Sequence, residues 1–448
     1  MKGTLLEGNI RRQLILLALP LLLGSILQEL YNTVDSMIIG RFLGTEAFSA
    51  VGIAGSVMNL IIFVLTGFCT GVSVVFAQLY GSGDRSAFRR ESFVAISLGA
   101  GITLAVSALF MILLRPLLRL IQSPEELIPW IEDYLHIIIC GMIATYFYNL
   151  FSAMLRAIGD TRAATFFLFI AVCMNAVTDY LFVGVLGFGI SGAAWATVLS
   201  QLLSAVLCLI YILRRDRDLL CTRYEFHFEK SLVKRTLVFG FSSALHQSTL
   251  FIGKAFVQGA VNTIGTAGIA AFTASARIEG FANSFGTSMG QSLSVFISQN
   301  MGAGNHRRVK DGLKNGLFLG VIMGAVFSVL LYTLAVPGIG IFLDSSEAAA
   351  VAHGVAYLRQ IALFYILCFT GNHFLGYFRG AGYVYIPPVA TALHISIRVA
   401  LSYLLAGRLG LRAVGLATGI GWIAMTIYQV TMSIKLTRQM MRKEALQP

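Results

Sequence analysis

The chain has 448 residues, of which 57% are hydrophobic and only 12% are charged. Soluble domains carry about 25% charged residues, so this composition excludes an ordinary soluble domain. The formal net charge is +12, but the basic residues lie in connections between apolar segments, which argues against a nucleic-acid partner and for a membrane topology.

Apolar segments of about 20 residues or more recur along the chain, and each is long enough to cross the ~30 Å hydrocarbon core of a bilayer. We therefore predict an all-α, polytopic membrane protein with the lipid bilayer as its surroundings. The twelve predicted spans, in chain order, are 14–39, 49–79, 92–114, 131–155, 163–184, 190–213, 235–260, 266–299, 313–336, 350–378, 386–406 and 411–434.

The basic residues orient these spans. If both termini are cytoplasmic, most Lys and Arg residues of the connections lie inside, as the positive-inside rule requires. The few that remain outside are Arg41, Arg115, Arg119, Arg408 and Arg412. We therefore expect both termini in the cytoplasm. No cleavable signal peptide is expected, because the first apolar run is too long for one.

A polar connection, residues 214–234, divides the chain almost in half, and the halves repeat one another. Shifts of 221 and then 223 residues superpose Gly44 on Gly265, Gln78 on Gln299, Gly83 on Gly304, Pro116 on Pro337, Gly159 on Gly382 and Gly187 on Gly410. We predict an N-terminal lobe, 1–213, a cytoplasmic linker, 214–234, and a C-terminal lobe, 235–448. With six spans in each, the repeat is parallel, and a central cleft is expected.

The first span contains a carboxylate, Asp35, at a depth where a charge is costly and usually serves ion coupling, substrate contact or a proton relay. Asn175 and Asp179 share one face of the fifth span, and Thr197 shares a face of the sixth span with Gln201. At 1.5 Å per residue, Asp35, Asp179 and Thr197 all lie about 7–12 Å below the outer boundary. A hydrated position for Asp35 near the membrane surface is the alternative.

Two carboxylates in a low dielectric cannot easily both be ionised, so such a pair exchanges a proton or replaces it with a monovalent cation. We predict that the coupling residues are Asp35, Asn175, Asp179 and Thr197. The alternative is a set of interhelical hydrogen bonds that only holds the lobe together.

Other polar residues in the spans are candidates for substrate contact. Gln28 and Asn32 extend the polar stripe of Asp35, and Gln201 lies one turn after Thr197. Arg277 and Glu279 flank one residue of the eighth span, so they either contact substrate or balance each other.

The second half differs from the first at one position of this pattern. Arg398, with His394 one turn before it, occupies the repeat position of Asn175, so a cation replaces a polar amide.

Enzyme chemistry has no support in the sequence. The HExxH and GxxxxGK[ST] patterns are absent, and the six cysteines form no CxxC pair. The histidines do not cluster as metal ligands. We predict a protein that is not an enzyme and needs no cofactor or metal.

Three segments resemble the MATE family, the multidrug and toxic compound extrusion transporters. They are VDSMIIGRFLGTEAFSAVGIA from residue 34, RAIGDTR from residue 156 and SGAAWATVLSQ from residue 191. The resemblance covers essentially the whole chain. It implies a V-shaped pair of six-helix lobes in a bacterial cytoplasmic membrane, and cation- or proton-coupled export of amphipathic, often cationic, organic compounds by what we expect to be a monomer. The residues of this chain that match the polar site of proton-type members are Asp35, Asn175, Asp179 and Thr197.

The chain departs from the sodium-type members that it resembles. Those members carry acids in helix seven and near the exit turn of helix ten, where this chain has His246, Gln247 and Tyr383. The resemblance is therefore nearer to the DNA-damage-inducible branch, with protons favoured over sodium as the coupling ion.

Two other functions remain open. The first is a flippase for a lipid-linked precursor, which would need cationic side chains for a pyrophosphate; Lys254, Arg277 and Arg398 are the candidates. The second is a membrane-embedded enzyme or scaffold.

Overall fold

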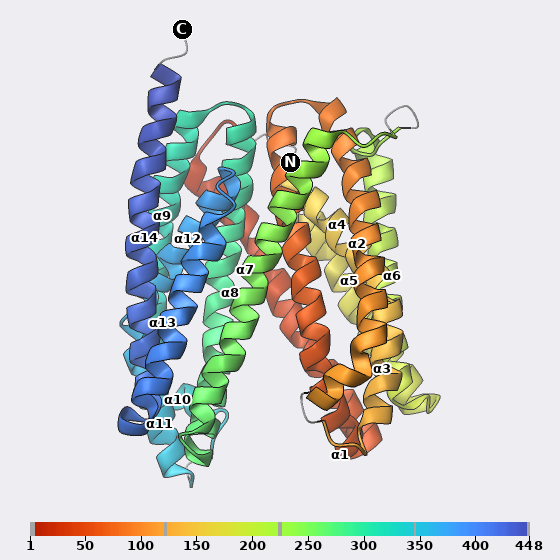
Figure 1. Cartoon of the computed structure of the whole chain (residues 1–448), viewed down its shortest axis with the longest axis vertical. Coiled ribbons are helices and arrows are strands. Elements are labelled where there is room, and N and C mark those ends of the chain that lie inside the picture. Colours follow the sequence, from red (N-terminus) through yellow and green to blue (C-terminus); the bar gives the residue numbers. More distant parts are fainter. Residues whose placement is uncertain (1–4, 121–122, 223–225, 345, 446–448) are drawn as a thin grey trace. The chain divides into compact units, whose positions relative to one another are not determined.

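The computed structural model describes residues 5–120, 123–222, 226–344 and 346–445, with side chains through Gln439. Within these residues the regular structure is helical and contains no strand (Figure 1). The α-helices are α1 (Ile10–Gly81), α2 (Arg85–Leu120), α3 (Ile128–Cys140), α4 (Met142–Ala157), α5 (Thr161–Asp179), α6 (Gly189–Arg215), α7 (Lys230–Asn262), α8 (Thr266–Gly302), α9 (His306–Thr333), α10 (Ala335–Gly340), α11 (Ala348–Ala362), α12 (Tyr365–Gly380), α13 (Ile386–Leu409) and α14 (Leu411–Ala445). A π-helix, η1 (Tyr180–Val185), follows α5, and a 3-10 helix, η2 (Arg217–Leu219), follows α6.

The predicted all-helical, multi-pass fold is confirmed, and every predicted span coincides with one of these helices, a bent pair of them or half of α1. The 72 residues of α1 would extend about 108 Å as one rod, but the backbone breaks at Gly44, where φ is 84° and ψ is −173°. By length and composition seven of the described helices could cross a membrane, or nine if the bent pairs α3–α4 and α11–α12 are single spans. Although α7 and α8 are long enough, they are too polar to meet the same criterion.

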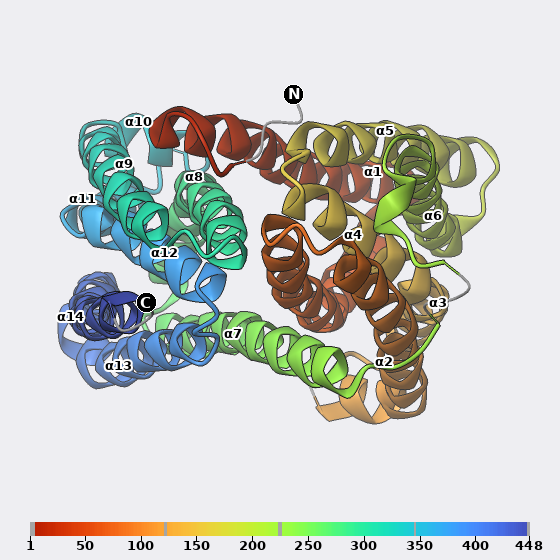
Figure 2. The same cartoon turned by 90° about the horizontal axis from the view of Figure 1, so that it is seen from above.

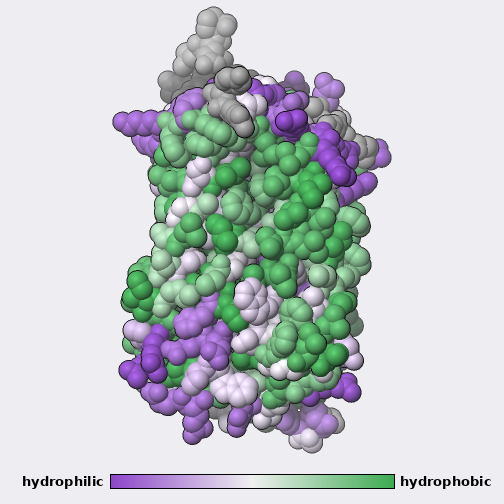
Figure 3. Space-filling model, turned by 90° about the vertical axis from the view of Figure 1, so that its right-hand side faces the viewer, coloured by the Kyte–Doolittle hydropathy of each residue, from purple (hydrophilic) through white to green (hydrophobic). Residues whose placement is uncertain are grey.

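Hydrophobic side chains cover the middle of the face shown in Figure 3, and hydrophilic side chains gather mainly at its two ends. This distribution fits a surface that meets lipid along its middle and water at its ends.

The internal repeat is visible in the backbone. Gly44 and Gly265 occupy equivalent positions and have φ values of 84° and 96°, a region that residues with a Cβ atom avoid. Three more equivalent pairs share positive φ: Gly83 with Gly304, Gly159 with Gly382, and Gly187 with Gly410. After the first of these pairs, Asp84 and Asn305 each accept a hydrogen bond from a backbone N–H and cap the next helix. The two halves therefore turn at the same places by the same means.

The helices pack into two compact units: a first unit of residues 23–244 and a second unit of residues 5–22 and 245–445. Packing thus assigns the start of α1 to the second unit and the start of α7 to the first unit. The lobes 1–213 and 235–448, which follow the repeat, remain a prediction. Within the units, α5 lies beside α6 and α13 lies beside α14 (Figures 1 and 2).

In the first unit the start of α7 packs tightly on α1 and α2. A Cβ atom on Gly71 would lie 2.0 Å from the carbonyl oxygen of Phe239, so only glycine permits this approach of α1 and α7. Thr236 donates a 2.7 Å hydrogen bond to the fully buried carboxylate of Glu91, and Arg235 donates one to Gln78.

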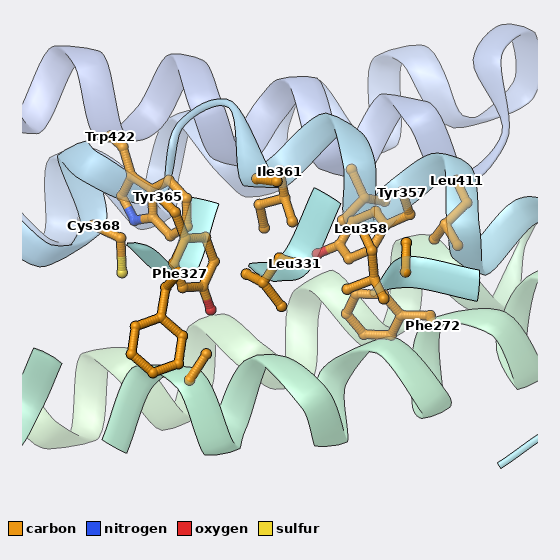
Figure 4. Packing of buried hydrophobic residues seen from close by; sticks show 14 of the residues in the cluster. Phe272, Phe327, Leu331, Tyr357, Leu358, Ile361, Tyr365, Cys368, Leu411 and Trp422 are labelled. Carbon is orange, nitrogen blue, oxygen red and sulfur yellow. The ribbon is translucent and has the colours of Figure 1, made fainter. Parts of the chain in front are cut away.

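In the second unit the N-terminal segment, residues 5–22, packs on α8 and α9. Ser292 donates a 2.6 Å hydrogen bond to the carbonyl oxygen of Leu14, and Asn300 donates one to that of Leu5. Arg308 donates to the carbonyl oxygens of Leu5 and Glu7, both at 3.0 Å. An aromatic core of the same unit, including Phe272, Phe327, Tyr357, Tyr365 and Trp422, lies between its helices (Figure 4).

Candidate functional site

Two buried carboxylates define the candidate site in the first unit. Asp35 lies in α1 before the Gly44 break and is 8% exposed, and Asp179 is the last residue of α5 and is fully buried. Their carboxyl groups lie within direct reach of each other. This contact joins α1 to the end of α5 at a depth where a charge is costly.

The π-helix η1 begins immediately after Asp179. Its wider turn is closed by a 2.8 Å hydrogen bond from the N–H of Leu186 to the carbonyl of Leu181. Such turns interrupt the regular α ladder and occur frequently at functional sites. Here the interruption leaves Asp179 at the junction of two helical geometries.

Neighbouring helices complete the site. Tyr31, one turn before Asp35, donates a 3.0 Å hydrogen bond to the Thr197 hydroxyl of α6. Tyr134 of α3 is 2% exposed and interacts electrostatically with both carboxyl groups. Asn175 is 1% exposed and interacts with Asp179 from the preceding turn of α5.

Several polar atoms of this site are buried without a hydrogen-bond partner among the described residues. They are Oδ1 of Asp35, both carboxylate oxygens of Asp179, Nδ2 of Asn175 and Oε1 of Gln201. Buried polar groups are normally paired, so these unpaired atoms distinguish the site from an ordinary packed interior. The described residues contain no group of three His, Cys, Asp or Glu side chains that could hold a metal ion.

The structure thus brings together the four predicted coupling residues, although their role in coupling remains a prediction. Gln201 lies nearby on α6, one turn after Thr197, whereas Gln28 and Asn32 are exposed on α1.

The remaining substrate candidates, Arg277 and Glu279, lie in α8 of the second unit. Arg277 is exposed, and Glu279 interacts with Tyr357, Arg398 and Lys254. Of the two alternatives, a balance between Arg277 and Glu279 is not the arrangement seen, because Glu279 interacts with Arg398 and Lys254 instead. Residues two apart on a helix do not face each other.

Sequence reasoning missed Tyr31 and Tyr134. Tyr31 stands four residues before Asp35, so helical spacing alone could have identified it. Tyr134 had no comparable signal, since only tertiary packing brings α3 against α1 and α6.

The long apolar helices define a polytopic membrane protein. A model of the MatE family matches residues 20–181 and 242–404, one stretch in each repeat. The chain belongs to the MatE family, as the resemblance predicted, and is a transporter rather than an enzyme.

Relatives of known name support the same assignment. The chain is 28% identical over 420 residues to the "Probable multidrug resistance protein YpnP" of Bacillus subtilis, covering 93% of each chain. It is 28% identical over 332 residues to a "FAD transporter" of Shewanella oneidensis, covering 73% of this chain and 72% of the relative. A solved structure described as an outward-facing multidrug resistance MATE family transporter matches with a TM-score of 0.91 at 22% identity, covering 99% of both chains. This last likeness establishes the fold.

Proposed function

We propose that the protein is a secondary multidrug efflux antiporter that exports amphipathic, often cationic, organic compounds in exchange for protons. The observation that carries this proposal is the buried Asp35–Asp179 pair, in which the two carboxyl groups face each other with unpaired oxygens. The relative named as a multidrug resistance protein supports the efflux function.

The pair couples proton binding to the contact between α1 and α5. With one proton, one carboxyl group donates a hydrogen bond to the other; without it, two negative charges repel each other in a medium of low dielectric. Tyr31 and Thr197 join α6 to the same network through their 3.0 Å hydrogen bond. Release of the proton therefore favours separation of the helices that carry the pair.

Two positions support protons over sodium as the coupling ion. His246 is buried in α7, and its Nδ1 lies 2.9 Å from the Thr391 hydroxyl, so a hydrogen-bonded imidazole ring stands where a carboxylate would be needed. Tyr383, in the turn between α12 and α13, has a phenol whose pKa is raised by burial, so it is uncharged. Neither position supplies an anion for Na⁺.

The test is efflux of a fluorescent organic cation from proteoliposomes under an imposed pH gradient or an imposed sodium gradient. We expect the pH gradient alone to drive the wild type, Asp35→Asn to keep only a small residual rate because its amide cannot titrate, and the exposed control Asp133→Asn to be active. Efflux driven by the sodium gradient alone would show that the coupling ion is Na⁺ rather than a proton. Normal efflux by Asp35→Asn would refute the site, and efflux under neither gradient would favour the lipid-precursor flippase.

A further inference from the structure

A second polar cluster lies within the second unit, on four helices. Its members are Lys254 of α7, Glu279 of α8, Tyr357 of α11, and His394 and Arg398 of α13. Tyr357 interacts with both Glu279 and Arg398, and His394 and Glu279 interact with Arg398.

Neighbouring aromatic residues fix this cluster in place. Tyr365 donates a 3.3 Å hydrogen bond to the carbonyl oxygen of Glu279, and the His394 ring stacks on Trp422 with ring centroids 6.0 Å apart. Figure 4 shows Tyr357 and Tyr365 inside the packed layer that separates these helices. Aromatic neighbours therefore hold Glu279 and His394 in position.

Hydrogen-bond donors of this cluster lack acceptors. The Nε of Arg398 and the Nε2 of His394 are buried and have no hydrogen-bond partner among the described residues. The buried phenol oxygen of Tyr357 is near Glu279 and Arg398 but makes no hydrogen bond of ordinary geometry with them. Tyr357 is fully buried, and His394 is 6% exposed. An arginine Nε can only donate, and a phenol or a histidine ring nitrogen can also donate. The cluster thus has the opposite character to the acceptor-rich Asp35–Asp179 pair.

Arg398 lies about 18 Å along α13 from Ile386 and about 17 Å from Leu409, close to the middle of the span. It is half-buried, as is Glu279, whereas Lys254 is exposed. Charged side chains at such a depth normally face a bundle interior or a water-filled route and mark the path of a substrate. The depth and partial exposure of Arg398 and Glu279 are those expected of such a path.

We infer that Arg398 and Tyr357 bind an anionic group, a carboxylate or a phosphate, on an amphipathic substrate. The inference rests on the proposed transport function and deepens it, since it adds zwitterionic and anionic compounds to the cationic ones. The planar guanidinium presents its N–H groups in a fork that matches both anions, and Tyr357 supplies a further donor from α11. Glu279 holds Arg398 in position and is the internal anion with which the substrate competes.

The experiment measures binding to the purified full-length protein by fluorescence anisotropy. One probe is a xanthene dye with a free carboxylate, and its matched control is the methyl ester of the same dye. We expect the acid to bind the wild type about tenfold more tightly than the ester, as one charge-assisted hydrogen-bonded pair provides. Arg398→Gln should bring the two affinities together by weakening the acid only, and Arg398→Lys should restore part of the preference.

Two further variants guard against a folding defect. Tyr357→Phe removes only a hydroxyl group, and it should reduce the preference for the acid a few-fold even if Arg398→Gln does not fold. Arg359→Gln changes an exposed arginine that stacks on Tyr332, with 5.5 Å from the guanidinium carbon to the ring centroid, and it should keep the full preference.

A second matched pair, farnesyl phosphate and farnesol, competes with the dye and separates a lipid phosphate from a carboxylate drug as the source of the anion. If farnesyl phosphate displaces the dye but farnesol does not, and if this displacement is lost in Arg398→Gln, the site binds a lipid phosphate. Equal wild-type affinity for both dyes without displacement by the phosphate, or a preference that survives Arg398→Gln, overturns the inference. Failure of the proposed transport function is a separate result: the wild-type protein would then show no gradient-driven efflux.

Discussion

Tyr31 donates a hydrogen bond of 3.0 Å to Thr197, and this bond joins α1 to α6 beside the Asp35–Asp179 pair. Because Tyr31 lies one turn before Asp35, any movement of the carboxylate along or around α1 also moves the phenol. The bond therefore restrains the position of Asp35 relative to α6.

The first prediction concerns Tyr31→Phe, which removes this bond and keeps the ring. A neutral hydrogen bond contributes about 1 kcal/mol, so we expect proton-driven efflux to slow about fivefold without loss of folded protein. Efflux rates from proteoliposomes across a range of pH gradients measure the effect. Tyr180→Phe is the matched control, because Tyr180 is 53% exposed and has no such bond in the described structure. An equal effect of both variants would show that Tyr31 has no special role.

The second prediction concerns Asp179→Asn. If the two carboxyl groups act as one proton-binding unit, losses at each are not additive. We expect Asp179→Asn to reduce driven efflux at least about tenfold, and the double variant Asp35→Asn/Asp179→Asn to be no worse than Asp35→Asn alone. Together with the wild-type rate, the rates of these three variants complete a double-mutant cycle. Independent, multiplying effects would contradict a shared site.

The third prediction tests the close approach of α1 and α7. Gly71→Ala places a methyl group 2.0 Å from the Phe239 carbonyl oxygen, so the helices must separate, and we expect a loss of about 1–3 kcal/mol in unfolding free energy. Denaturant unfolding in detergent measures it. Gly52→Ala is the control in the same helix, because its Cβ atom would meet nothing within 4 Å. Similar stabilities of the two variants would contradict the close packing.

The fourth prediction concerns the N-terminal segment. Arg308→Ala removes the hydrogen bonds to the carbonyl oxygens of Leu5 and Glu7 and a 2.8 Å bond to the side chain of Gln13. We expect hydrogen exchange of residues 5–13 to accelerate about tenfold or more, while the core of α8 stays protected. Exchange followed by mass spectrometry measures both regions. Arg307→Ala, an exposed neighbour, should leave exchange unchanged.

Much of the fold follows from the sequence because two physical signals are strong. Apolar length alone locates the spans, and glycines at equivalent turns mark the repeat, since few other residues adopt the positive φ measured at Gly44 and Gly265. Depth along a helix also placed Asp35 and Asp179 at one level, and the structure brings their carboxyl groups together. These features depend on local chain geometry.

The remaining features depend on long-range packing, for which a single sequence has no signal. Glu279 interacts with Arg398, more than 100 residues away, rather than with Arg277, two residues away. Likewise, no local pattern indicates that Tyr134 interacts with the carboxyl pair, or that the start of α1 packs with the second half of the chain.

The packing of the start of α1 in the second unit affects the order in which the chain folds. Ser292 binds the carbonyl of Leu14 across 278 residues, and at about 5–20 residues per second the ribosome needs roughly 14 to 56 s to make the chain between them. For that time the apolar start of α1 has none of its native neighbours in α8 or α9. The start of α1 is made before α8 and α9 and reaches its final packing only after them, so the second unit is completed by residues made before the rest of it.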